Sequence, residues 1–420
     1  MESHAKEGAA EQREDPRQRK SRHNLSNTIV LMATVSFVAL VLRWPGLDFI
    51  SNDAKSFLLP WYDKISELEL AALGQQVGNY GIPYQFLILV GTYTPLPALA
   101  LCKSISIAFD YLLAWQVFLL VQQISRSETK AAIAYGVILI LPPVVANSAV
   151  WGQCDAIYSC FAVAAIRALF RNKPPLAFFL LGVALSFKLQ ACFIVPFFAY
   201  CLLFRRIRII PAALWAVLGF YLLSIPGIIA GRSLFAPLEI YFGQAATYAA
   251  MYLNYPSFWV MISNNFEFFK LPAIGLTVFV LLAGFCIDYR MRRSAAFRPS
   301  HHRAILLATW SAWTCVEFLP AMHERYGYLI AVLLIVCLFC MRNWKLPLLC
   351  CLIVIACDCV TYSNYLFNAQ INLLPCSIAL FIAWAIFGIQ VFLPSPSMHH
   401  PREPAINQKD SADELYLRSY

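Results

Sequence analysis

The stretch LLPCSIALFIAWAIFGIQVFL, residues 373–393, decides the fold class of this chain. It holds no charged residue, and its length is close to what a helix needs to cross a hydrocarbon core of about 30 Å. A second uncharged run covers residues 327–341. Neither run alternates apolar with polar residues, as the strands of a membrane β-barrel do. Both runs therefore predict transmembrane helices.

The composition extends this prediction to the whole chain. The 420 residues are 60% hydrophobic and only 13% charged, about half the charge of a typical soluble domain. We expect an all-α fold, a polytopic transmembrane helical bundle of about 12 to 13 segments, because apolar runs of this kind recur along the sequence. The expected segments are 27–44, 83–101, 105–122, 131–149, 154–170, 175–187, 189–204, 209–229, 271–289, 304–320, 326–341, 346–361 and 373–393.

The basic residues set the orientation. The formal net charge is +9, but the charges fall in short clusters between apolar segments, as in cytoplasmic loops, and they do not call for a nucleic-acid partner. The clusters are Arg17–Arg22, Arg167–Lys173, Arg205–Arg208, Arg290–Arg298 and Arg342–Lys345. With the clusters inside, the outer side receives residues 45–82, 149–155, 230–270, the segment around His323, and 361–372.

One part of this topology stays open at the sequence level. Residues 83–122 hold two apolar runs, although their two flanks require an odd number of crossings. The run 83–101, with its three prolines, therefore either lies at the membrane interface or forms a broken helix.

The domain organisation follows from the same pattern. Residues 1–26 are expected to be a disordered cytoplasmic tail and 394–420 a disordered C-terminal tail, around a single transmembrane domain at 27–393. The first outer loop, 45–82, contains SELELAAL at 66–73, which predicts a short amphipathic helix on the membrane surface. The second outer loop, 230–270, is rich in aromatic residues. These favour an interfacial belt, with a cover over a sugar or lipid site as the alternative.

The segments 175–187 and 189–204 predict a short hairpin with both ends in the cytoplasm, because basic clusters flank it. Each leg is short for a full crossing at 1.5 Å per residue. Its tip, SFKLQ, carries Lys188 and Gln190. A lysine at or below the outer headgroups requires a water-filled cavity or an anionic partner.

Ionisable residues from five regions are predicted to gather at the outer face. Charged side chains near a bilayer core point to a functional site. They are Asp53, Asp155, Lys188, the run His323, Glu324 and Arg325, and Glu317 one to two turns deeper. We expect Asp155 to face a watery cavity that opens outward beneath the first outer loop.

Each of these residues also has a purely structural reading. Asp155 can cap a helix amino terminus, and Lys188 can extend its ammonium to the headgroups. The run 323–325 can form an internal ion pair, and Asp53 can be a solvated loop residue. The CxxC pair Cys337 and Cys340 lies in an apolar helix with no histidine nearby, so it is expected to fill the core.

The motifs together resemble the bacterial GT-C integral-membrane glycosyltransferases, in particular the proteins similar to polyprenyl- or dolichyl-phosphate-mannose-dependent mannosyltransferases. The resemblance covers about residues 27–393. It is carried by D-x-x-x-F-L-x-P-W at 53–61, GNYGIPY at 78–84, WGQCD at 151–155, SFKLQ at 186–190 and MHERY at 322–326.

This resemblance implies an enzyme. A hexosyltransferase of this class moves a single sugar, commonly mannose, from a polyprenyl-phosphate donor to an acceptor hydroxyl on a glycan or lipid-linked acceptor. It implies a multi-pass protein of the bacterial inner membrane, in the lipid bilayer, with the active site facing the periplasm and with products such as cell-envelope polysaccharide or glycolipid.

The resemblance also implies roles for individual residues. Asp53 is the expected general base for an acceptor attack that inverts the anomeric centre from the face opposite the phosphate. Lys188, Arg325 and His323 are expected to bind the donor phosphate. The residues expected to bind or orient the sugar or acceptor are Trp151, Gln153, Asp155, Gln190 and Glu324.

The first outer loop departs from the family in one respect. An acid of that loop often has a second acid beside it, whereas here Asp53 stands in SND, with Asp48 five residues earlier and no D-x-D. A divalent cation, Mg²⁺ or Mn²⁺, stays an open cofactor, and no metal ligands are assigned.

Two other functions stay open. A flippase or transporter of lipid-linked sugars also keeps intramembrane charges, but transporters commonly carry repeated halves, and no second copy of WGQCD or SFKLQ is present. An O-antigen-type polymerase or ligase uses arginines in a very large outer loop, whereas 230–270 contains only Arg232.

Overall fold

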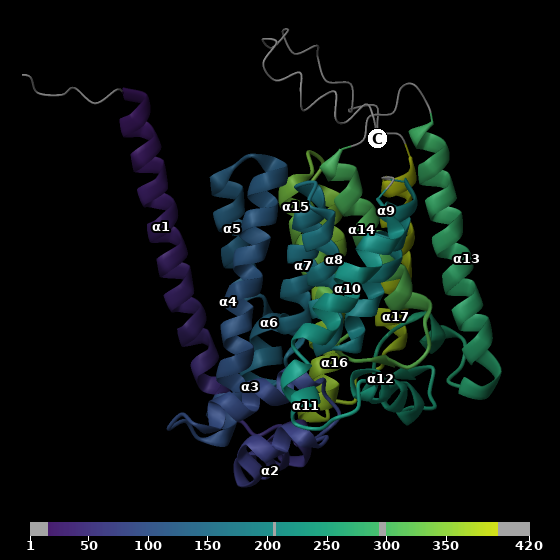
Figure 1. Ribbon diagram of the computed structural model, residues 1–420. Coiled ribbons are helices and arrows are strands. Elements are labelled where there is room, and N and C mark those ends of the chain that lie inside the picture. Colours follow the sequence, from purple (N-terminus) through teal and green to yellow (C-terminus); the bar gives the residue numbers. More distant parts are fainter. Residues whose placement is uncertain (1–15, 205–206, 294–299, 394–420) are drawn as a thin grey trace, which may run out of the picture.

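The computed structural model describes residues 16–204, 207–293 and 300–393, and these form a bundle of helices that run between two ends of the molecule (Figure 1). The long helices of the first half are α1 (Pro16–Arg43), α4 (Ala98–Ser125), α5 (Glu128–Ile140), α7 (Asp155–Phe170), α8 (Pro174–Phe187), α9 (Val195–Phe204) and α10 (Ile209–Leu222). Those of the second half are α13 (Phe266–Arg292), α14 (His301–Phe318), α15 (Tyr328–Cys340), α16 (Lys345–Phe367) and α17 (Leu374–Phe392).

Shorter elements complete the described chain. The short α-helices are α2 (Leu59–Leu68), α3 (Ile82–Thr92), α6 (Pro142–Val145), α11 (Ile225–Ile229) and α12 (Ala236–Thr247). The 3-10 segments are η1 (Trp44–Gly46), η3 (Glu69–Gly74), η5 (Leu189–Ile194) and η6 (Phe258–Met261), and the π-helical segments are η2 (Ala54–Leu58) and η4 (Ala146–Trp151). The two strands are β1 (Tyr252–Leu253) and β2 (Met322–His323), which pair in parallel.

Length and composition indicate a multi-pass membrane protein. Five of the described helices are long and apolar enough to cross a membrane, and the bent pair formed by 128–140 and 142–151 makes a sixth. The predicted all-α bundle is confirmed at this level. The figure of 12 to 13 segments also counts shorter apolar helices, such as α8 and α15, and stays a prediction.

The structure resolves the open part of the predicted topology. The apolar run 83–101 does not form one helix, because α3 ends at Thr92 and α4 begins at Ala98. α3 packs against α2 and η3 at the lower end of the bundle in Figure 1, and α4 alone runs through the bundle. Pro95 and Pro97, which remove backbone donors, occupy the break.

Two other boundaries differ from the prediction. The N-terminal tail was expected to be disordered through residue 26, but α1 begins at Pro16. Proline suits the first turn of a helix, and the residues after it are good helix formers. The segment 131–149 bends by 50° because Pro142 and Pro143 interrupt the backbone hydrogen bonds. The C-terminal tail 394–420 lies outside the described residues.

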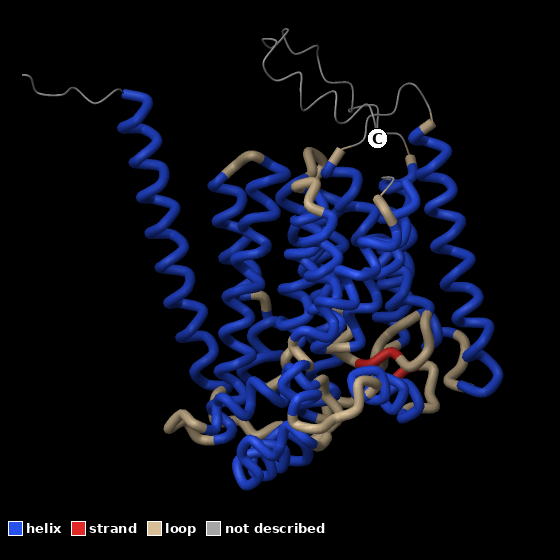
Figure 2. Tube along the Cα trace, viewed as in Figure 1, coloured by secondary structure: helices blue, strands red, loops and turns tan. Residues whose placement is uncertain are grey.

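The two ends of the bundle differ in character. The start of α1 and the ends of α13 and α17 lie at the upper end in Figure 1, which carries the basic clusters around residues 17–22 and 290–293. The lower end holds α2, α3, α11 and α12, and the two strands lie toward it (Figure 2). The positive-inside rule predicts that the lower end is the non-cytoplasmic one.

The core lies along α14 and α15. Every residue of α14 from Arg303 to Phe318 is buried, and so is nearly all of α15. Helices that are apolar all round are enclosed by other helices, here α9, α13, α16 and α17. All 14 cysteines lie within the described residues and are unpaired, and Cys337 and Cys340 are buried in the core as predicted.

Candidate functional site

Asp53 is buried at the outer end of the bundle and is held by three donors. Its Oδ2 accepts hydrogen bonds from the Trp151 indole, 2.8 Å from Nε1, and from the Gln153 amide, 2.6 Å from Nε2. Its Oδ1 accepts one from the Tyr365 hydroxyl. The residue is 8% exposed, so the alternative reading of Asp53 as a solvated loop residue is wrong.

The local backbone explains why Asp53 meets the WGQCD motif. The π-helical segment η2 begins directly after Asp53, and η4 ends at Trp151. Insertions of this kind re-aim side chains and often occur at functional sites. Gly152 then adopts φ +81°, a left-handed conformation that favours glycine, and the chain turns there before α7. The Ser51 hydroxyl fastens the two segments together by donating to the Trp151 carbonyl at 2.7 Å.

Asp155 forms the second half of the site with Lys188. The Lys188 ammonium lies 2.6 Å from Asp155 Oδ1, and both side chains are almost fully buried. The Asn147 amide donates to Asp155 Oδ2 at 2.8 Å. Asp155 is the first residue of α7, but its side chain makes no capping bond. The capping reading of Asp155 and the reading of Lys188 as a headgroup-reaching lysine are both wrong.

The predicted hairpin places Lys188 there. α8 ends at Phe187, Lys188 is extended, and η5 and α9 return the chain toward the cytoplasmic end. The break between the two helices thus presents the ammonium from the hairpin tip. The anionic partner that a lysine at this depth requires is Asp155.

Arg325 and Glu324 complete the charged cluster. Arg325 Nε lies 3.5 Å from Asp155 Oδ2, and its Nη1 donates to Glu324 Oε1 at 3.2 Å. The guanidinium also lies over the Trp151 ring, 5.6 Å from its centroid, a favourable cation–π position. Glu324 is therefore an ion-pair partner of Arg325 in this arrangement.

Gln153 links the two halves of the site. Its Nε2 donates to Asp53, while its Oε1 accepts from the Tyr80 hydroxyl at 2.6 Å and lies 3.5 Å from the Lys188 ammonium. Desolvation raises the pKa of Tyr80 well above its usual value, so the phenol stays protonated and fixes the orientation of the amide. A single side chain thus separates Asp53 from Lys188.

Three predicted residues lie beside this cluster without joining it. His323 is paired with Glu324 at 3.7 Å and packs against Tyr248, with ring centroids 4.5 Å apart. Gln190 is buried next to Tyr326. Glu317 is buried on α14 and is bonded to neither Asp53 nor Lys188.

Part of the second outer loop covers the MHERY segment. β1 pairs with β2, and Asn254 bridges to His323. Met251 and Tyr255 are fully buried, so the interfacial-belt prediction is wrong for this part of the loop. Aromatic residues farther along, such as Phe268, remain exposed, as a belt requires.

A buried lysine anchors the start of the first outer loop. The Lys103 ammonium, on α4, donates to the carbonyls of Gly46, Leu47 and Phe49 at 2.6–3.0 Å. It carries no partner carboxylate among these contacts, and three carbonyls together satisfy its three donors. This anchor fixes the turn that leads into Asp53.

The sequence interpretation missed three neutral residues of the site. Tyr365 stacks on Trp151 with centroids 4.6 Å apart and bonds Asp53, Asn147 bonds Asp155, and Tyr80 bonds Gln153. Tyr80 lies in the quoted GNYGIPY motif, which was a signal. Asn147 lies within the apolar run 131–149, where only a lone polar residue marks it, and Tyr365 lies in the predicted outer loop 361–372.

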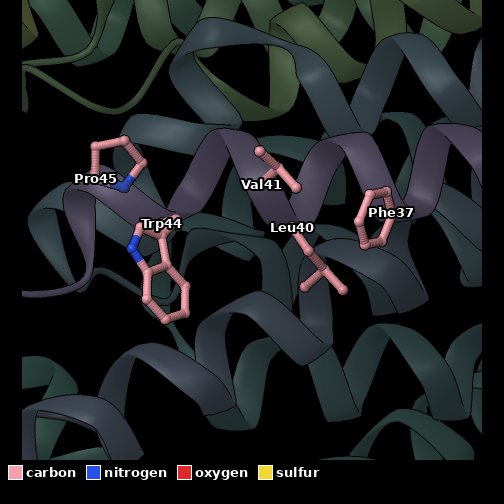
Figure 3. A pocket seen from close by; sticks show the side chains of 5 residues that line it. All are labelled: Phe37, Leu40, Val41, Trp44 and Pro45. Atoms are coloured by element: carbon pink, nitrogen blue, oxygen red, sulfur yellow. The ribbon is translucent and has the colours of Figure 1, made fainter.

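The predicted outward-opening watery cavity around Asp155 is wrong for this conformation, because Asp155 is fully buried among its partners. The larger described cavity, about 510 Å³, lies elsewhere, along the apolar face of α1 (Figure 3). A smaller one, about 290 Å³, lies between the loop at 76–79 and α12. In a bilayer the α1 cavity faces lipid hydrocarbon.

The residues of this site do not fit a metal ion. Among the described residues, no group of three or more His, Cys, Asp or Glu side chains is placed to hold one. The oxygens of Asp53 face N–H and O–H donors from three side chains.

The site as built can accept a proton at Asp53 and present two cations nearby. The sequence matches no protein-family model and no curated protein.

Proposed function

We propose that the protein is a membrane glycosyltransferase that moves one sugar from a polyprenyl-phosphate donor to an acceptor hydroxyl. Mannose is the proposed sugar, and the site faces the non-cytoplasmic side, the periplasm if the membrane is a bacterial inner membrane. The acceptor is a glycan or a lipid-linked glycan.

One observation carries this proposal. A buried carboxylate, Asp53, and two cations, Lys188 and Arg325, belong to one cluster of hydrogen bonds and ion pairs at the outer end of the bundle. Transfer from a sugar phosphate needs a base for the acceptor proton and cations for the charge on the departing phosphate. The cluster supplies both kinds of group.

The proton step falls to Asp53. Its Oδ2 already accepts two hydrogen bonds and its Oδ1 only one, so Oδ1 retains a lone pair for the acceptor hydroxyl. As the acceptor oxygen bonds to the anomeric carbon, its proton moves to Asp53. The bond from that carbon to the phosphate oxygen breaks on the opposite face, which inverts the configuration.

The phosphate step falls to Lys188 and Arg325. In the described conformation Asp155 and Glu324 neutralise both cations. The donor phosphate therefore has to take the place of Asp155 on Lys188 and Arg325. Asp155 then acts as a counter-ion that keeps the cations in position before the donor arrives. His323, the neighbour of Glu324 in the sequence, is proposed to contact the donor from the side.

The test is a screen of defined polyprenyl-phosphate sugars with purified protein in nanodiscs. We expect one donor to be turned over, and we expect Asp53→Asn to lower kcat by about a thousandfold, the scale on which removal of a catalytic base acts, while donor binding is retained.

The matched control is Asp63→Asn, which changes an exposed carboxylate of the same outer region and should leave kcat unchanged. Full turnover by Asp53→Asn would exclude Asp53 as the base. If no polyprenyl-phosphate sugar is consumed by the wild type, the proposed function is wrong.

A further inference from the structure

A second cavity lies at the same end of the bundle as the candidate site. It measures about 290 Å³ and lies between the loop that follows η3 and the helix α12. The Gln244 amide on α12 donates to the backbone carbonyl of Asn79, so the two walls are fastened to each other. α12 lies at the same end of the bundle as α2 and α3 (Figure 1).

The lining is neutral and mixed, with amide side chains standing among apolar surface that includes Ile240. Three amide side chains, Gln76, Asn79 and Gln244, line the cavity together with the hydroxyl of Thr247. No charged side chain is among its lining residues. Gln76 already bonds Gly78, Tyr80 and Arg232, so the Asn79 and Gln244 amides are the groups left to donate to and accept from the hydroxyl groups of a sugar. A phosphate ligand would call for arginine or lysine.

The cation beside this wall, Arg232, is already hydrogen-bonded within the protein. Arg232 donates to the Gln76 side chain at 2.6 Å and to the Leu73 carbonyl at 2.7 Å, and it also bonds Gln75 and Gln85. Its donors thus point into the protein and hold the η3 region. This arrangement stabilises the wall and leaves the cavity neutral.

The walls are preformed and flat enough for a ring to enter. Gln76 Nε2 donates to the carbonyls of Gly78 and Tyr80 at 2.8 and 3.0 Å, which fixes the loop. Gly78, with φ +79°, lies against the Trp61 ring. Gly243 adds no side chain on the α12 wall, and a Cβ there would meet nothing within 4 Å.

The cavity and the candidate site are linked by two neighbouring residues of the chain, Asn79 and Tyr80. Asn79 lines the cavity, and the next residue, Tyr80, donates to Gln153, which in turn donates to Asp53. A glycan seated on Asn79 and Gln244 would therefore bind one residue along the chain from Tyr80. An end residue that extends past Tyr80 would approach the carboxylate.

We propose that this cavity, between the 76–79 loop and α12, is a binding subsite for the neutral oligosaccharide part of the acceptor. The proposal rests on the proposed function for its biological meaning, but binding itself requires no turnover. It predicts that the acceptor is a neutral glycan and that recognition extends at least one sugar beyond the reacting hydroxyl.

The test is Gly243→Leu, which places a side chain in the cavity. The matched control is Gly275→Leu on α13, where a Cβ likewise meets nothing within 4 Å. Binding of neutral trisaccharides (mannotriose, maltotriose and cellotriose) is measured by saturation-transfer NMR on protein in nanodiscs, with the anionic trigalacturonate as charge control.

We expect at least one neutral trisaccharide to bind the wild type and Gly275→Leu, and to bind Gly243→Leu about tenfold more weakly. Trigalacturonate should not bind. The proposal is overturned if no neutral trisaccharide binds, if Gly243→Leu binds as well as the control, or if trigalacturonate is preferred.

These outcomes are separable from those of the proposed function. Sugar transfer without an effect of Gly243→Leu on glycan binding removes only the subsite. Binding that Gly243→Leu weakens, in a protein that consumes no lipid-linked sugar, removes only the transferase. Asp53→Asn should bind the trisaccharide like the wild type in either case.

Discussion

At the scale of single residues, the site is a set of buried charges that neutralise one another. Asp155 and Glu324 pair with two cations, Lys188 and Arg325, while neutral donors hold Asp53 beside them, and all five side chains are largely enclosed. Breaking a buried pair costs far more than the pair contributes, because one charge is left without a partner. A charged ligand group can therefore replace one ion-pair partner in this cluster, but removing a partner without a replacement is costly.

Lys188→Met tests this view. We expect it to lower the free energy of unfolding by about 3–5 kcal/mol, since Asp155 loses its closest cation. Asp155→Asn in the same chain should recover part of that loss, because the uncompensated carboxylate is then gone. Thermal unfolding of the two single variants and the double variant measures the coupling, and Lys173→Met, at an exposed position, is the control. Additive losses would contradict a direct ion pair.

At the scale of elements, a helix fixes a loop that carries the candidate base. The Lys103 ammonium on α4 donates to the backbone carbonyls of Gly46, Leu47 and Phe49 at the start of the first outer loop. The loop itself is short of regular structure between η1 and η2, so this anchor is what defines its path. Asp53 comes four residues after the last carbonyl held.

Lys103→Met should therefore lower both stability and turnover. Three carbonyls lose a charged donor, and we expect a loss of about 2–4 kcal/mol in the free energy of unfolding. Turnover should fall while binding of the lipid donor is kept, and Lys103→Arg should restore part of it. Lys130→Met, exposed on α5, should change neither quantity. Equal behaviour of the two methionine variants would show that the anchor is dispensable.

The sequence predicted elements unevenly, and the reason is physical. Apolar runs and basic clusters predicted the helices, the hairpin at 175–204 and the side on which Asp53, Asp155 and Arg325 gather, because bilayer solvation acts on every residue. The π-helical segments around Asp53 and Trp151 were not predicted, since one inserted residue does not change an apolar pattern. The partners Tyr365 and Asn147 were missed because neutral polar residues are common in outer loops and in such helices.

At the scale of the whole molecule, the depth of the site is set by the length of one helix. α8 has 14 residues, or about 21 Å at 1.5 Å per residue, whereas a hydrocarbon core is about 30 Å thick. Lys188 at its end therefore lies well inside the outer boundary of a bilayer of ordinary thickness. The donor phosphate and the acceptor hydroxyl have to reach that depth.

Turnover should accordingly depend on the lipid. We expect the rate to be higher in nanodiscs of short-chain lipids, which thin the hydrocarbon core, than in nanodiscs of long-chain lipids, because less of the phosphate's hydration is lost on reaching Lys188. The measurement is kcat/KM at matched protein folding, checked by thermal unfolding in each lipid. A rate that does not vary with chain length would place Lys188 at the headgroups in spite of the short helix.

The short hairpin has a consequence for how such a protein is tuned in a cell. Membrane thickness changes with fatty-acid length, sterol content and growth temperature. If the protein is the proposed transferase, its rate would follow the physical state of its membrane with no effector bound and no residue modified. Two turns added to α8 should uncouple glycan synthesis from lipid composition.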